Sequence, residues 1–248
     1  AQGKAVDYAI VSPAHMSTFS KAAPFIDAPF VFRDLDHWNK VLDADLLKPI
    51  ADEIGQKADV MLIGYAGGGT RNIFANRPAQ NLAELKGLKV RVQPGPIATR
   101  MVDLMGATAT PLAWGEVYTA LQAGVVDAAE NNVTALTLAR HGEVMKVYTR
   151  TEHTRVPDVL LIATATLERL KPEQQALLRQ AARDNAAAHN ARWKAELEKA
   201  EKEAATKLGV TFVDADRAAW RKVVQPMYDD LKATPALAAL ADRVQAAR

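Results

Sequence analysis

The 248-residue sequence contains no cysteine. A disulfide framework, a thiolate metal site and a cysteine nucleophile are therefore excluded. No apolar run reaches the roughly 18 residues that a membrane-spanning helix needs, so no segment is expected to cross a bilayer. No two of the five histidines lie three to five residues apart, which removes the usual helical metal pair. We predict neither a metal nor another cofactor.

Signatures of nucleic-acid binding and of common enzymes are also missing. The 31 Lys and Arg are scattered among 29 Asp and Glu, and no basic stretch is interleaved with aromatics, so no nucleic-acid partner is expected. No G-x-S-x-G elbow supplies a nucleophile. The segment Gly67-Gly68-Gly69 fits neither a dinucleotide nor a phosphate loop. On its own it indicates a flexible crossing, with an anion-binding nest or an oxyanion element as alternatives.

What the sequence does contain is an alternation of strand and helix patterns, typical of an α/β protein. The expected strands are 6–11, 60–65, 89–92, 107–111, 125–130, 144–148, 159–164 and 210–213. Helices are expected at 97–105, at 115–123 and around Leu136. A helix is also expected at 36–56, capped by Asp36 and kinked or broken at Pro49.

The segment from Pro172 to Leu208 contains no glycine and no further proline, and it is rich in strong helix formers. Pro172 suits a first helical position and Gly209 suits a stop. A single helix of this length would run about 50 Å, enough to cross between two small lobes. The alternative is two helices with a bend near Asp184 and Asn185.

The most specific motifs lie between Gly68 and Asn132. They are Gly69-Thr70-Arg71, then L-A-E-L-K-G-L-K-V-R-V-Q at 82–93, G-A-T-A-T-P-L-A-W-G-E-V-Y at 106–118, and G-V-V-D-A-A-E-N-N at 124–132. This ordered set resembles the substrate-binding proteins of tripartite ATP-independent periplasmic (TRAP) transporters. The resemblance covers essentially the whole chain.

The resemblance implies a set of ligand-binding residues. Arg91 would pair with the ligand carboxylate, Arg71 would lie within reach, and Asn131 would hydrogen-bond the same region. Trp114 would line the pocket, and His153 occupies a stretch that often contributes. Arginine suits this task because its two parallel N–H donors match the two carboxylate oxygens. The alternatives are a surface salt bridge for Arg91, an exposed hinge charge for Arg71, a core position for Trp114 and a structural role for His153.

The resemblance also implies a two-lobed, type II-like periplasmic-binding-protein fold with a long lobe-spanning helix. Residues 1–68 and 157–196 are assigned to lobe I, and residues 69–156 and 197–248 to lobe II, with hinge crossings near 66–70 and 154–158. Family members carry a further segment ahead of the position of Val6, so lobe I is expected to be N-terminally incomplete. No signal peptide is recognised in the chain.

The predicted function is extracytoplasmic capture of a small organic carboxylate, and the predicted ligand is a hydroxylated sugar acid such as a uronate or aldonate. The protein is expected to be a periplasmic monomer and not an enzyme, and to deliver its ligand to the small and large TRAP membrane subunits. A dicarboxylate or a keto acid is the alternative ligand. Alternatives of another class are an α/β hydrolase or lyase with His153 as base, and a receptor's ligand-sensing domain.

Overall fold

A computed structural model describes residues 6–247. The strands are β1 (Tyr8–Val11), β2 (Val60–Ala75), β3 (Lys89–Val92), β4 (Thr108–Pro111), β5 (Ala128–Asn131), β6 (Val147–Ala163) and β7 (Thr211–Asp214). The helices are α1 (Pro24–Asp27), α2 (Leu35–Asp43), α3 (Lys48–Lys57), α4 (Leu82–Leu85), α5 (Pro96–Leu104), α6 (Val117–Gln122), α7 (Thr134–Thr137), α8 (Thr164–Glu168), α9 (Pro172–Lys207), α10 (Arg217–Val223), α11 (Gln225–Lys232) and α12 (Pro235–Ala246). Three short 3₁₀ helices are η1 (Pro13–Thr18), η2 (Trp114–Glu116) and η3 (His141–Glu143).

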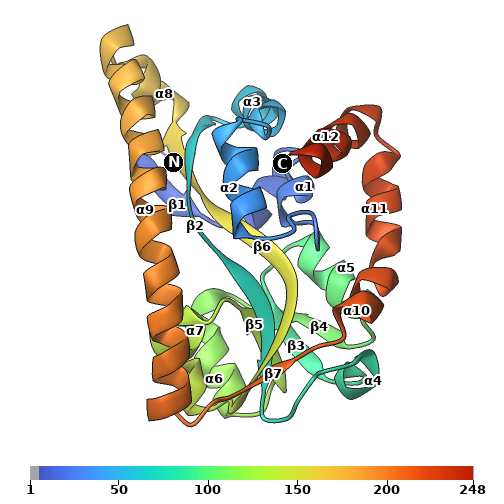
Figure 1. The fold of residues 1–248 in the computed structure, drawn as a ribbon. Helices are drawn as coiled ribbons and strands as arrows, with labels where there is room; N and C mark the ends of the chain where they lie inside the picture. The colour runs from blue at the N-terminus through green and yellow to red at the C-terminus, as the bar shows by residue number, and fades with distance from the viewer. Residues whose placement is uncertain (1–5, 248) are drawn as a thin grey trace.

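One open, mixed sheet joins the strands in the order β1-β6-β2-β5-β3-β4, with β7 beside β6. The centre of the sheet is the long antiparallel pair of β2 and β6, which runs through the middle of the molecule (Figure 1). β3 pairs in parallel with both β4 and β5, whereas β5 runs antiparallel to β2. The two long strands therefore connect two groups of elements that lie above and below each other in Figure 1.

Each of these groups is a lobe with apolar packing on both faces of its part of the sheet. In the first lobe, α1–α3 cover one face and Ala182 of α9 packs on the other. In the second lobe, α5 and α10 lie over one face, while α6, α7 and the end of α9 lie over the other. Neighbouring residues Ile73 and Phe74 of β2 point into opposite clusters, as the two-residue repeat of a strand requires. The predicted two-lobed α/β fold is confirmed.

Helix α9 is one continuous helix of 36 residues, as predicted, without a break near Asp184 and Asn185. It runs along the full height of the molecule (Figure 1). Its buried residues are all alanines: Ala182 packs in the first lobe, and Ala200 and Ala204 pack in the second. Among residues 6–247, no helix combines the length and the apolar character that crossing a membrane requires.

Several predicted boundaries were wrong at the level of single elements. The helix expected at 36–56 is two helices, α2 and α3. The side chain that caps the start of α2 is Asp34 rather than Asp36. The break precedes Pro49, since Asp45 adopts a left-handed backbone (φ 50°) and Pro49 lies in the first turn of α3, where proline is tolerated.

The strand expected at 60–65 does not end at the glycines. β2 continues through them to Ala75, with a register shift against β6 between Ala66 and Gly69. Gly67 (φ 65°) and Gly68 (φ 97°) make this irregularity possible, because L side chains rarely adopt these angles. The strands expected at 144–148 and 159–164 are likewise parts of one strand, β6. Both predicted crossings, 66–70 and 154–158, thus lie within paired strands.

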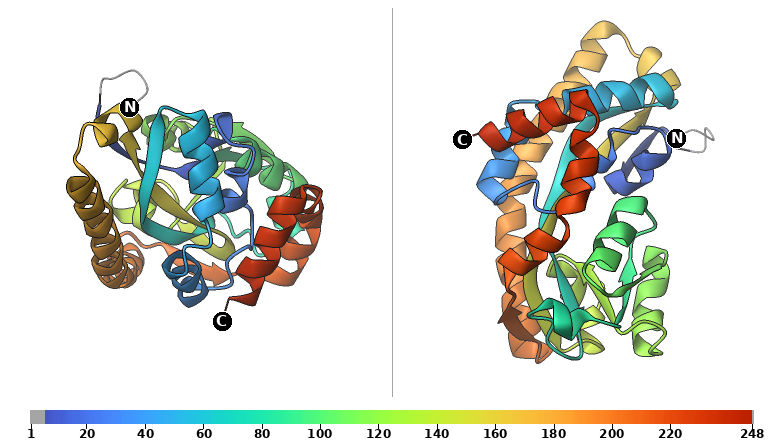
Figure 2. Two further views of the ribbon diagram at one scale, coloured as in Figure 1. Left: turned by 90° about the horizontal axis from the view of Figure 1, so that it is seen from above. Right: turned by 90° about the vertical axis from the view of Figure 1, so that its right-hand side faces the viewer.

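The C-terminal helices connect the two lobes on the opposite side from α9 (Figure 2). Trp220 of α10 and Met227 of α11 pack in the second lobe, but Leu237, Leu240 and Val244 of α12 pack with α1–α3 in the first. We therefore keep the proposed division of the chain with one change: α12, assigned above to lobe II within 197–248, is placed with lobe I.

Candidate functional site

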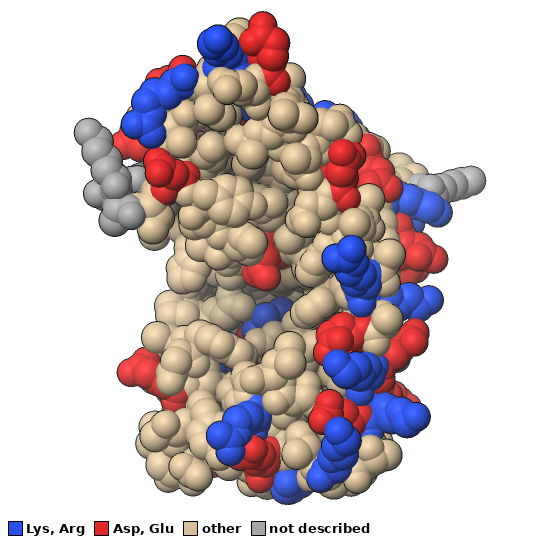
Figure 3. All heavy atoms as spheres, turned by 90° about the vertical axis from the view of Figure 1, so that its left-hand side faces the viewer, with Lys and Arg blue, Asp and Glu red and all other residues tan. Residues whose placement is uncertain are grey.

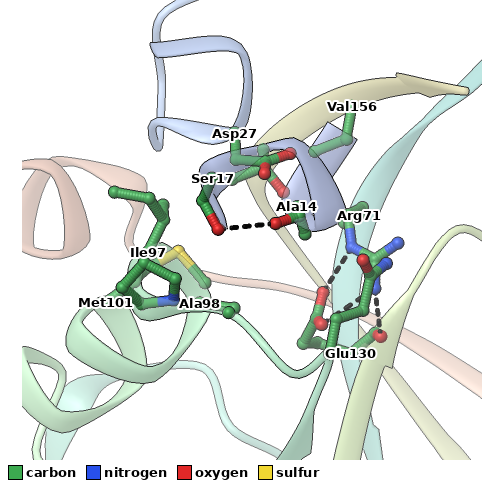
Figure 4. Close-up of a pocket in the computed structure, with 13 residues that line it drawn as sticks. Ala14, Ser17, Asp27, Arg71, Ile97, Ala98, Met101, Glu130 and Val156 are labelled. Atoms are coloured by element: carbon green, nitrogen blue, oxygen red, sulfur yellow. Dashed lines mark hydrogen bonds and ion pairs between the residues drawn. The ribbon is translucent and has the colours of Figure 1, made fainter. Parts of the chain in front are cut away.

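A pocket with an empty volume of about 430 Å³, part of it open to solvent, lies between the two lobes. It draws on both of them, and its lining residues are Ala14, Ser17, Asp27, Arg71, Gln93, Gly95, Pro96, Ile97, Ala98, Met101, Glu130, Thr154 and Val156. Figure 4 shows α5 forming one wall, with Asp27 and η1 on another and the pair Arg71–Glu130 on a third. The molecular face in Figure 3 is hollowed at mid-height, with basic atoms inside the hollow and acidic atoms on the wall above.

Arg71 and Glu130 form a buried, bidentate ion pair from the neighbouring strands β2 and β5. Arg71 Nε donates to Glu130 Oε2 (2.6 Å), and Nη2 donates to Oε1 (2.8 Å) and to the backbone oxygen of Glu130 (2.9 Å). Burial would raise the pKa of the Glu130 carboxyl, but Arg71 and a hydrogen bond from His153 hold it at about 2. Burial would likewise lower the pKa of Arg71, but Glu130 outweighs this and raises it.

The remaining guanidinium nitrogen of Arg71 is also occupied. Nη1 donates to Asn131 Oδ1 (3.2 Å). When the Gln93 amide is oriented to suit both of its neighbours, its oxygen accepts from Arg71 Nη1 (3.0 Å) and Nη2 (3.2 Å), and its nitrogen donates to Ser12 Oγ (2.6 Å). Every nitrogen of Arg71 therefore has a protein acceptor, and Arg71 is buried rather than an exposed hinge charge.

Arg91 is the second buried arginine, and its side chain is only 1% exposed. Its Nε and Nη2 donate to the backbone oxygen of Leu112 at 3.0 and 2.6 Å, but its Nη1 is buried without a hydrogen-bond partner. Among the described residues no carboxylate forms an ion pair with it. Burial lowers its pKa to about 10, with Glu130 raising it and Arg71 lowering it. Arg91 is therefore a cation at neutral pH with free donors, although it is not among the residues that line the pocket.

Asn131 and His153 both contact the Arg71–Glu130 pair. Asn131 accepts from Arg71, and its Nδ2 donates to no residue in the described part of the chain. His153 is fully buried behind Glu130: its Nε2 donates to Glu130 Oε2 (3.3 Å), and its Nδ1 accepts from Thr151 Oγ1 (2.8 Å). Burial lowers the pKa of His153 despite Glu130, so the ring is neutral at pH 7. It fixes Glu130 and does not line the pocket.

Trp114 lies on η2 and is 51% exposed, so it is not in the core. It is also not among the residues that line this pocket. Its ring lies 5.7 Å from the Arg91 guanidinium carbon and 5.1 Å from the His141 ring. Burial lowers the pKa of His141 to about 4, and the nearby Arg91 lowers it too, so His141 is neutral. Trp114 therefore covers the outer side of Arg91.

Asp27 lines the pocket and was not identified from the sequence. It ends the short helix α1, whose Phe25 and Ile26 are buried in the core of the first lobe. Its carboxylate forms no hydrogen bond and no ion pair with any residue of the described chain. Burial raises its pKa to about 7, while Arg71 lowers it and Glu130 raises it.

Comparison with known proteins places the chain in a family. The family model "Bacterial extracellular solute-binding protein, family 7" (DctP) matches residues 1–234. The protein YiiZ of Salmonella typhimurium is 36% identical over 245 residues, which are 98% of this chain and 75% of YiiZ.

Solved structures agree with this match. A TRAP periplasmic solute-binding protein of Xanthobacter autotrophicus with bound β-D-galacturonate is 32% identical, with a TM-score of 0.95 over 100% of this chain and 82% of that one. A TRAP periplasmic protein of Anaerococcus prevotii with bound D-glucuronate is 31% identical, with a TM-score of 0.93 over 98% and 80% of the two chains. These are binding proteins of transporters and not enzymes. The chain belongs to the DctP family of bacterial extracellular solute-binding proteins, the family of the TRAP solute-binding proteins.

Proposed function

We propose that this protein binds a hexuronate in the periplasm, as a monomer, and delivers it to the membrane subunits of a TRAP transporter. The proposal is supported above all by the unpartnered Nη1 of Arg91, a buried cation whose free N–H groups a ligand anion would satisfy. A buried unsatisfied donor on a charged group is costly, and a ligand carboxylate would remove that cost. The bound uronates of the two structural neighbours support the same class of ligand.

In this proposal the two arginines have different tasks. Arg91 binds the carboxylate, whereas Arg71 is saturated by Glu130 and holds Asn131 in place. The Asn131 Nδ2 group then supplies a neutral donor to the ligand carboxylate or to a neighbouring hydroxyl. Ile97 and Met101 of α5 offer apolar contact to the C–H faces of the sugar ring. Trp114 closes the site over Arg91, and His153 acts through Glu130.

Since the pocket walls come from both lobes, we propose that ligand binding favours a closed arrangement of the lobes. Closure would bring Asp27 and η1 of the first lobe against a ligand held by the second lobe. Such a change is a population shift, driven by contacts that only the closed form makes. The membrane subunits would then recognise the closed form.

Thermal unfolding in the presence of D-galacturonate, D-glucuronate, D-galactose and D-glucose tests this proposal. We expect at least one uronate to stabilise the protein, by about 2.7 kcal/mol at 100 times its Kd. The matching neutral sugar should have no effect, because it lacks the carboxylate that Arg91 requires. Equal stabilisation by an acid and its neutral sugar, or by none of the four, would contradict the proposal.

A further inference from the structure

We propose that Asp27 determines ligand specificity: it accepts hydrogen bonds from sugar hydroxyls and excludes acids that carry a second carboxylate at that end. This inference rests on the proposed function, since it concerns the same pocket. It names the feature that would separate hexuronates from the six-carbon diacids of the same length, the hexarates.

The charged residues of the pocket lining leave one carboxylate unbalanced. Three charged residues line the pocket: Asp27, Arg71 and Glu130. Arg71 and Glu130 neutralise each other through a bidentate pair that is almost wholly buried. Asp27 is the charged lining residue that no described residue pairs with. The ligand therefore meets one unpaired cation beside the pocket, Arg91, and one unpaired carboxylate in it.

The Asp27 carboxylate also needs hydrogen-bond donors that the described residues do not supply. An ionised carboxylate only accepts hydrogen bonds, so an uncharged partner must offer an O–H or N–H donor. In the chain itself, the nearby hydroxyl of Ser17 is already used, because it donates to the backbone oxygen of Ala14 (2.8 Å). The hydroxyl groups of a sugar acid would meet this need. Figure 4 shows Asp27 and the pair Arg71–Glu130 on different walls of the pocket.

Asp27 would also repel a second carboxylate on the ligand. A diacid that places one carboxylate at Arg91 would bring the other into the pocket that holds Asp27 and no free cation. Two like charges brought close together repel each other, so each disfavours the ionised form of the other. The environment already disfavours the ionised form of Asp27, because burial raises its pKa to about 7. A further anion beside it would be disfavoured more strongly.

Calorimetric titration at pH 8 with D-galacturonate and with galactarate tests the inference. The variants are Asp27→Asn and Asp27→Ser, both of which remove the charge while keeping a polar side chain. The matched control is Asp158→Asn, since burial also raises the pKa of Asp158 and Arg71 also lowers it, but Asp158 does not line the pocket.

We expect the wild type to prefer galacturonate, so that the Kd for galactarate exceeds the Kd for galacturonate. Each Asp27 variant should reduce the ratio of the galactarate Kd to the galacturonate Kd by about tenfold or more. Part of this change should come from tighter galactarate binding, which loss of folding cannot produce. Asp158→Asn should leave the ratio within about twofold. Wild-type binding of galacturonate with an unchanged ratio in both Asp27 variants would overturn this inference alone. A wild type that binds neither D-galacturonate nor D-glucuronate would overturn the proposed function together with it.

Discussion

Arg71 and Arg91 are both buried, both lie on central strands and are separated by 20 residues, yet their surroundings are opposite. Glu130, Asn131 and Gln93 occupy every nitrogen of Arg71, whereas only the Leu112 carbonyl serves Arg91. The pKa of Arg71 is raised and that of Arg91 is lowered. A buried arginine is therefore available to a ligand only where the protein leaves its N–H donors unpaired.

The largest expected effect is on stability, from Arg71→Ala. This change leaves the buried Glu130 carboxyl without its partner, which typically costs about 3–5 kcal/mol. Urea unfolding followed by circular dichroism should show this loss of stability. Arg91→Ala should show a much smaller loss, because that substitution removes no ion pair. Equal losses in the two variants would erase the distinction between the arginines.

The next effect is on binding, from Arg91→Ala. We expect the affinity for a bound uronate to fall about 10²- to 10³-fold with the fold intact, because the ligand carboxylate loses its cation. Arg91→Lys should give an intermediate loss, since it keeps the charge but not the planar donor pair. Calorimetry measures the three affinities. An Arg91→Ala protein that binds within about threefold of wild type would show that the carboxylate binds elsewhere.

The two carboxylates of the site extend the comparison to pH. The pKa of Glu130 is held at about 2, so its stabilisation is present above about pH 4.5 and is lost as pH falls towards 2. The pKa of Asp27 is raised to about 7, so its contribution is present below about pH 4 and is lost as pH rises through 7. At about 1.4 kcal/mol per pKa unit, the contribution is at most about 3–4 kcal/mol for Glu130 and about 4–5 kcal/mol for Asp27.

Unfolding free energies between pH 3 and 8 measure both contributions. The stability gap between wild type and Glu130→Gln should narrow towards low pH. Relative to Asp27→Asn, the wild type should instead lose stability towards high pH. The free energy of unfolding of wild type, relative to each variant, should change with pH in opposite directions for Glu130→Gln and Asp27→Asn. A change in the same direction for both would contradict the opposite pKa shifts of Glu130 and Asp27.

The smallest effect should come from Trp114→Ala. Trp114 is half exposed and faces the Arg91 guanidinium at 5.7 Å, a geometry typically worth about 0.5–1 kcal/mol at exposed sites. We therefore expect a loss of uronate affinity of about two- to fivefold, measured by the same calorimetry. A loss as large as that of Arg91→Ala would mean that Trp114 contacts the ligand directly.

The sequence allowed the α/β class, the long helix and most strands to be predicted, because these depend on local periodicity and on glycine and proline. The motifs also identified both arginines. They could not show that Arg71 is saturated, because Glu130 on strand β5 and Gln93, directly after strand β3, reach it through the tertiary fold. The C-terminal helices α10–α12 were not predicted, nor was the packing of α12 on the first lobe.

The missed residue, Asp27, did leave a signal. It is the only polar residue between Ala22 and Phe32, in a stretch that is otherwise alanine, proline and large apolar residues. A lone acidic residue in such a run must find a partner, reach solvent or face a cavity. Which of these applies is decided by packing, because the apolar neighbours Phe25 and Ile26 fix the direction of α1 against the core.

The unbroken helix α9 also limits how the protein can change in length. Each residue of an α-helix turns the chain by about 100°, so one deletion between Ala182 and Ala200 would rotate the contact face at Ala200 and Ala204 off the second lobe. A change in length also moves these two alanines along the helix axis, by about 1.5 Å per residue. Insertions or deletions in this span should therefore weaken the contact between α9 and the second lobe.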